Sequence, residues 1–185
     1  MSRVLQPGGA TRIEVNGKSP HAVGVLVDWE NPAADLDVTA LLCDAQGKVL
    51  SNAHFIYWSA PDGPDRSAFI RSVGVGAPTR RGGRGQFLVN LEDLDAGVIR
   101  IFVALSTVAA GHSIGSGGAF RVRLVSLDDG WEIASFGPVA GSQTDYCLVL
   151  GALVRGPAGW DFHVVAQPHP HGLNGLVRAH GVNVQ

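Results

Sequence analysis

The chain has 185 residues and a formal net charge of -2, and hydrophobic residues make up 45% of it. This combination excludes a disordered chain, and the small net charge argues against a general nucleic-acid binder. The 25 Gly and 10 Pro residues form about a fifth of the chain, against roughly an eighth in average proteins. Such frequent turn-forming residues favour many short strands over a few long helices.

Several segments alternate between apolar and other residues, which predicts half-buried strands. In chain order the predicted strands are 23–27, 38–43, 53–58, 67–73, 86–89, 98–105, 119–125, 131–136, 146–154 and 160–165. The pattern is clearest in 119–125, where Arg121 and Arg123 alternate with Phe120, Val122 and Leu124. Segments 98–105 and 146–154 are apolar on both faces, which is typical of central strands.

The connections between these segments are short and contain turn-forming residues, as at 44–47, 128–130 and 156–159. Helical periodicity is limited to one turn at 91–94 and a short helix at 172–181. The sequence therefore predicts an all-β fold, an antiparallel β-sandwich of two sheets with one or two short helices. No linker or repeat divides the chain, so residues 1–185 are expected to form a single domain.

The hydropathy of the chain also bears on its location. No stretch approaches the ~20 apolar residues that a membrane-spanning helix needs. The beginning of the chain contains no apolar core of the kind found in signal peptides. We therefore expect no membrane span and a cytoplasmic protein.

A series of segments resembles one known family. The segment Ala34-Asp-Leu-Asp-Val-Thr-Ala-Leu-Leu is similar to the first signature of the TerD family of bacterial tellurium-resistance and stress proteins. The further matching segments are Val23-Gly-Val-Leu-Val-Asp-Trp-Glu, Gly47-Lys-Val-Leu-Ser-Asn-Ala-His-Phe-Ile-Tyr, Gln86-Phe-Leu-Val-Asn-Leu, Ala119-Phe-Arg-Val-Arg-Leu, Trp131-Glu-Ile-Ala, Leu150-Gly-Ala-Leu-Val-Arg, Trp160-Asp-Phe and Gly172-Leu-Asn-Gly-Leu-Val. These matches follow the family's order over nearly the whole chain.

The resemblance implies a β-sandwich with calcium sites formed by acidic loops at one end. It implies a binding or scaffold role in stress response and tellurite resistance, with no established enzymatic reaction. The expected partners are proteins, other TerD-like proteins among them. No arrangement of nucleophile, base and orienting residue is visible in the sequence, so we expect a protein that is not an enzyme.

Asp35 and Asp37 are the candidate calcium ligands. They lie two residues apart, so in extended backbone both carboxylates project to the same side. Calcium takes about six to eight oxygen ligands, and Asp28, Glu30 and Asn31 lie just upstream. From the residues alone, a solvated acidic loop is the favoured interpretation.

The family's second acidic loop is altered in this chain. The aligned stretch, 73–85, reads Val73-Gly-Val-Gly-Ala-Pro-Thr-Arg-Arg-Gly-Gly-Arg-Gly and contains no carboxylate. The family's Asp-Asn pair falls on Gly74 and Val75, and its acidic triplet falls on 83–85. Asn52 and His54 also stand where the family often has Asp. Because ligand charge controls calcium affinity, we predict a weak or lost calcium site around the remaining carboxylates, and no other cofactor.

Arg80, Arg81 and Arg84 occupy this altered loop. One hypothesis is that an arginine pairs with Asp35 or Asp37 and replaces the metal as counter-charge, since a guanidinium fits a carboxylate bidentately. A second is an interaction module whose Arg loop binds an anionic partner, nucleic acid or phospholipid, with nucleic acid disfavoured by the absence of a basic background. A solvated basic loop is the third.

Four histidines gather near the C-terminus, namely His163, His169, His171 and His180. Histidine is the commonest transition-metal ligand, so a metal site is one interpretation. The alternating prolines at 168–170 favour an extended path that separates His169 from His171. A solvated loop is therefore the favoured interpretation.

Overall fold

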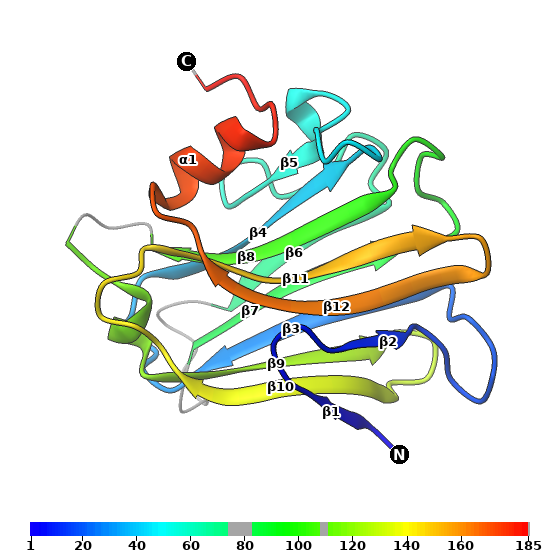
Figure 1. Cartoon of the computed structure of the whole chain (residues 1–185), viewed down its shortest axis with the longest axis horizontal. Helices are drawn as coiled ribbons and strands as arrows, with labels where there is room; N and C mark the ends of the chain where they lie inside the picture. The colour runs from blue at the N-terminus through cyan, green and yellow to red at the C-terminus, as the bar shows by residue number, and fades with distance from the viewer. Residues whose placement is uncertain (74–82, 108–110, 185) are drawn as a thin grey trace.

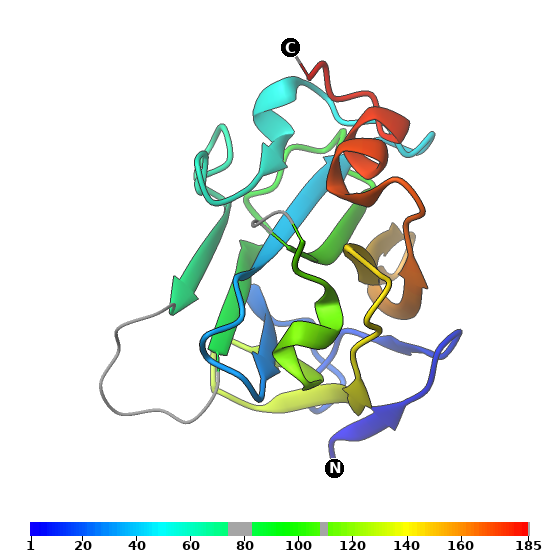
Figure 2. The same ribbon diagram turned by 90° about the vertical axis from the view of Figure 1, so that its left-hand side faces the viewer.

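The protein is a sandwich of two six-stranded sheets, as seen in a computed structural model that describes residues 1–73, 83–107 and 111–184 (Figures 1 and 2). The first sheet has the order β1 (Arg3–Leu5), β10 (Glu132–Ala140), β9 (Ala119–Ser126), β3 (Ala22–Trp29), β7 (Gly83–Asn90) and β6 (Ala68–Val73). The second has the order β2 (Ala10–Arg12), β12 (Gly159–Pro168), β11 (Cys147–Gly156), β8 (Arg100–Thr107), β4 (Leu36–Cys43) and β5 (Phe55–Ile56). All paired strands are antiparallel except β1 and β10. The predicted fold class is confirmed.

The core lies between the sheets and is filled by alternate residues of each strand. Val25 and Val27 of β3 and Leu124 of β9 are buried there, as their alternation predicts. The intervening side chains, such as Arg121 and Arg123, lie on the outer face of the first sheet. The period-two pattern therefore identified which face of these strands meets the core.

The outer face of the second sheet is partly covered by the only α-helix of the described residues, α1 (Gly172–Ala179) (Figure 1). Leu176 and Val177 of α1 pack against Leu41, Ala104 and Val149. β8 and β11 are central strands covered on both faces, which confirms the prediction from their continuous apolar pattern.

Neither α1 nor the two 3-10 turns could span a bilayer. No helix in the described part of the chain combines the length and the hydropathy that crossing a membrane requires.

Three local predictions differ from the structure. Segment 53–58 contributes only the two residues of β5, because Asn52–His54 form a 3-10 turn (η1). Residues 91–94 form a turn and no helix, since the Asn90 side chain accepts hydrogen bonds from the backbone N–H groups of Glu92 and Asp93. β1 and β2 were not predicted, because three residues are too few to show an alternation.

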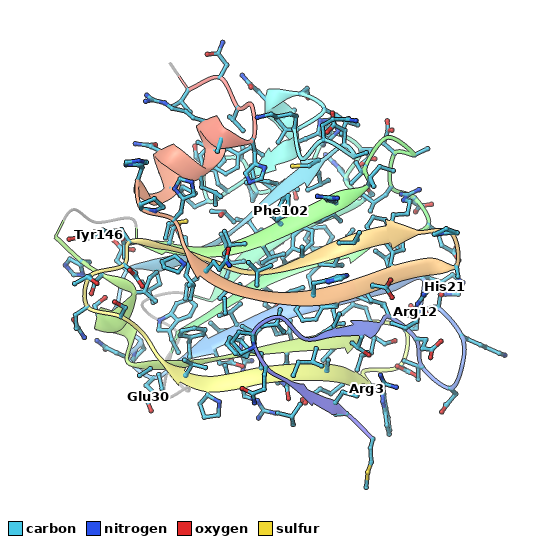
Figure 3. The ribbon with its side chains drawn as sticks, viewed as in Figure 1. Arg3, Arg12, His21, Glu30, Phe102 and Tyr146 are labelled. Atoms are coloured by element: carbon cyan, nitrogen blue, oxygen red, sulfur yellow. The ribbon has the colours of Figure 1, made fainter. Side chains whose placement is uncertain are left out.

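His21 is held at the start of β3 by Asp128 of the β9–β10 turn (Figure 3). The carboxylate accepts a hydrogen bond from the His21 backbone N–H at 2.8 Å and lies 2.9 Å from Nδ1 of the ring. This side-chain hydrogen bond, together with the charges of Glu92 and Asp128, raises the pKa of His21 above its ordinary value of 6.5. The histidine therefore contributes stability that is fully present below pH 6.5 and is lost as pH rises through the folded-state pKa.

We expect an NMR titration of the native protein to place the His21 midpoint above 6.5. In Asp128→Asn the midpoint should fall back toward that value, because the charged partner is gone. A native midpoint at or below 6.5 would contradict this assignment.

Candidate functional site

The two candidate calcium ligands lie where β3 passes into β4, at one end of the sandwich. Asp35 is exposed in the connection, and Asp37 is the second residue of β4, which begins earlier than predicted. Its neighbours Leu36 and Val38 are buried in the core between the sheets. Because side chains alternate along a strand, Asp37 lies on the outer face of the second sheet, directly opposite Ser106 of β8.

Asp37 is a half-buried carboxylate without a compensating cation among the described residues. Burial raises its pKa above the usual range, and the nearby negative charge of Asp35 raises it further. No described group lowers it. Asp37 therefore pays a desolvation cost that a bound cation would offset.

Arg84 pairs with a different carboxylate from the one expected. It lies in β7 directly opposite Asp28 of β3, and its Nε is 2.5 Å from Asp28 Oδ1. Nη2 of Arg123 is 3.0 Å from the other oxygen, Oδ2, of the same carboxylate. These side chains lie on the outer face of the first sheet, whereas Asp37 lies on the outer face of the second. The hypothesis that Arg84 replaces the metal beside Asp35 or Asp37 is therefore wrong.

The other two arginines of the altered loop lie outside the residues that the structure describes. These are Arg80 and Arg81. The structure leaves their predicted roles as predictions.

Residues 83–85 belong to strand β7, although the sequence placed them in a loop. The side of β7 that carries Gly83 and Gly85 faces the core. A Cβ atom on Gly83 would overlap Nε1 of Trp29, and one on Gly85 would overlap Cγ2 of Val38. These glycines are packing positions, which the sequence could not distinguish from the glycines of a ligand-binding loop.

The polar residues upstream of Asp35 hold the β3–β4 connection in place. Glu30 accepts a hydrogen bond from the backbone N–H of Ala119 at 2.9 Å (Figure 3). Asn31 donates its side-chain amide to the carbonyl of Ser116, in the 3-10 turn η2 (Ile114–Gly117), also at 2.9 Å. These contacts tie the connection to η2 and to the start of β9. Glu30 and Asn31 thus have structural partners without a metal.

The four C-terminal histidines do not form one cluster. His180 contacts the carbonyl of Gly47 through Nδ1 at 2.6 Å and packs against Phe102. His169 and His171 have ring centroids 6.2 Å apart, and His163 is exposed on β12. Among the described residues, no group of three or more His, Cys, Asp or Glu side chains is placed to hold a metal ion.

A hollow of about 390 Å³ opens beside Asp37, and the sequence analysis did not anticipate it. Its lining includes Asp37, Thr39, Trp58, Ser106, Tyr146 and Asn174. Thr39 and Ser106 are hydroxyl residues within the largely apolar strands β4 and β8. These two hydroxyl residues were the sequence feature that could have indicated the hollow, since a hydroxyl inside an apolar strand requires a partner.

These features define a two-sheet β-sandwich whose acidic β3–β4 connection and hollow lie at one end, apart from the core. Comparison with known proteins gives a consistent result. The model of the TerD domain matches residues 1–180. Curated proteins named "Tellurium resistance protein TerD" from an Alcaligenes species and from Serratia marcescens are 27% and 26% identical over 192 aligned positions, covering 99% of each chain.

Solved structures share the fold. A crystal structure of a protein of unknown function has a TM-score of 0.69 at 20% identity, covering 90% of this chain and 100% of that one. A homologue of the telluride resistance protein TerD from Streptomyces coelicolor has a TM-score of 0.65 at 15% identity, covering 86% and 96%. The chain belongs to the TerD family, as its sequence motifs predicted.

Proposed function

We propose that this protein is a non-catalytic binding module of the stress or tellurite response, in which the family's calcium site is weak or lost. The observation that carries the proposal is that the nearby polar side chains already have hydrogen-bond or ion-pair partners within the protein. Asp28 is held by two guanidinium groups, and Glu30 and Asn31 hold the β3–β4 connection. Asp35 and Asp37 therefore remain as two carboxylates where calcium requires many more oxygen ligands.

The relatives support the class of function only at the level of their names. They are tellurium resistance proteins, and the match to them covers nearly the whole chain. We therefore propose, for this chain, both a role in tellurite resistance and a binding function without catalytic activity.

The alternative function is binding of an anionic partner through the Arg loop. Of the three arginines that the sequence suggested for it, one is engaged elsewhere. The Arg84 guanidinium is paired with Asp28 and lies in a strand. An anionic partner would therefore depend on Arg80 and Arg81, which lie outside the described residues. No observation in the described part of the chain favours this alternative over the first proposal.

We expect calcium to change the thermal stability of the protein very little. A site with a dissociation constant near 1 mM stabilises by only ~0.4 kcal/mol at 1 mM calcium, whereas a 10 µM site stabilises by about 2.7 kcal/mol. Thermal unfolding in 1 mM calcium and in a chelator should therefore differ by roughly 1 to 2 °C at most. A rise of several degrees that requires Asp35 and Asp37 would overturn the proposal.

A further inference from the structure

The hollow beside Asp37 has the composition of a binding site. Its floor is the outer face of β4 and β8, at the point where α1 no longer covers the second sheet. Asp37 and Thr39 point to the same side of β4, and Ser106 lies directly across from Asp37 on β8. Cβ atoms of such cross-strand partners lie only about 5 Å apart, so the three oxygen-bearing side chains form one polar surface.

The two hydroxyl groups on this floor have no partner among the described residues. Thr39 and Ser106 are each only 1% exposed, and neither Oγ1 of Thr39 nor Oγ of Ser106 makes a hydrogen bond. A buried hydroxyl without a partner costs roughly 1 to 3 kcal/mol. Two such groups beside an uncompensated carboxylate form an arrangement that a ligand or ordered water would complete.

Two aromatic side chains stand at the rim of the hollow. Trp58 is 61% exposed and Tyr146 is 50% exposed, although residues of this type are usually buried. The backbone carbonyl of Tyr146 (labelled in Figure 3) accepts a hydrogen bond from the N–H of Thr107 at 3.0 Å, which fixes this residue to the C-terminal end of β8. Aromatic faces attract cations, so the rim and the carboxylate favour the same kind of ligand.

We propose that the hollow binds a small organic ammonium ion, with the ammonium group on Asp37 and hydrogen bonds to Thr39 and Ser106. An ammonium group offers three N–H donors, which match one carboxylate and two hydroxyl oxygens. The volume is in the range of small-molecule pockets. The inference rests on the proposed function, because a calcium ion held tightly at Asp37 would occupy the same carboxylate.

The test uses ethanolamine, protonated at pH 8, with ethylene glycol as its neutral isostere. Each is titrated into the ¹⁵N-labelled full chain at constant ionic strength, and chemical shifts are followed by NMR. We expect a saturable shift of the Trp58 indole and of the β4 and β8 amides, with a dissociation constant of about 1 mM, as suits so small a ligand. Ethylene glycol should produce no saturable shift.

Four variants separate a site from a general effect of charge. Asp37→Asn should weaken ethanolamine binding at least about tenfold, because it removes the counter-charge. Asp35→Asn, the same change two residues away on an exposed side chain, should weaken it far less, because this carboxylate acts on the bound cation only through its nearby charge. Thr39→Val and Ser106→Ala should also weaken binding but leave the folded protein at least as stable, because each removes a buried hydroxyl that has no partner.

The inference is overturned if no saturable shift appears up to about 50 mM ethanolamine, if ethylene glycol binds equally well, or if Asp35→Asn weakens binding as much as Asp37→Asn. The first result would mean that ordered water alone satisfies the two hydroxyls. If ethanolamine does not bind as predicted and a calcium titration also shows no binding, the ammonium site is overturned but the proposed function is not. Micromolar calcium binding that Asp37→Asn abolishes would instead overturn the proposed function, and the ammonium site with it.

Discussion

Substituting Asp for Gly83 is expected to destabilise the protein by about 3 kcal/mol or more, although the family resemblance aligns an acidic residue with this position. Gly83 faces the core from β7, and any Cβ there would overlap the indole of Trp29, which is only 5% exposed. The indole cannot move aside without disturbing the core at this end of the sandwich. An aspartate would in addition place a charge in an apolar environment.

Gly83→Ala isolates the steric part of this effect. Replacing Gly by Ala in a strand normally stabilises by roughly 0.5 to 1 kcal/mol, so a loss of stability reverses the usual sign. Gly85→Ala should behave in the same way, because its Cβ would meet Val38. Urea unfolding of the three variants measures the free energies directly.

Gly156→Ala is the matched control, since it lies in β11 and its nearest neighbour would be a carbonyl oxygen 3.5 Å away. Its stability should stay within about 0.5 kcal/mol of the wild type. If Gly83→Ala proved as stable as this control, β7 would not pack against Trp29 as described.

Asp28→Asn is expected to cost about 1 to 2 kcal/mol of stability, between the values for exposed and buried ion pairs. Asp28 holds two guanidinium groups, those of Arg84 and Arg123, and all three side chains are about one quarter to one third exposed. Without the carboxylate, the two positive charges lie side by side with no counter-charge. The loss should shrink at high salt, because screening reduces their repulsion.

A double variant tests whether the loss of stability in Asp28→Asn arises from repulsion between the two arginines left without a counter-charge. Asp28→Asn combined with Arg84→Gln should be more stable than the sum of the two single effects predicts, since it removes one of the repelling charges. Asp35→Asn, an equal change of charge at an exposed position, should have an effect below about 0.5 kcal/mol. Strict additivity in denaturant unfolding would show that Asp28, Arg84 and Arg123 do not interact as one charged group.

The fold was predictable because alternation and turn residues act locally. The period of two in β3 and β9 identifies the buried face, and the continuous apolar pattern identifies β8 and β11 as central. The short edge strands β1 and β2 escaped prediction, since pairing with β10 and β12 creates them and their own three residues carry no pattern.

The site was less predictable, because its geometry depends on which face each side chain takes. The pairing of Arg84 with Asp28 requires knowing that 83–85 extend β7, and glycines concealed that extension. The hollow beside Asp37 joins residues from β4, β8 and the start of α1, which are far apart in the sequence. A sequence motif can indicate the acidic pair, but only the register places Ser106 opposite Asp37.

We propose that this TerD-family member keeps the family fold but binds calcium weakly or not at all. Isothermal titration of calcium into chelator-treated protein measures this affinity directly. Our account predicts no heat above dilution at micromolar calcium, or at most a weak isotherm in the millimolar range that depends on Asp35 and Asp37. A saturating isotherm with a micromolar dissociation constant would contradict the account.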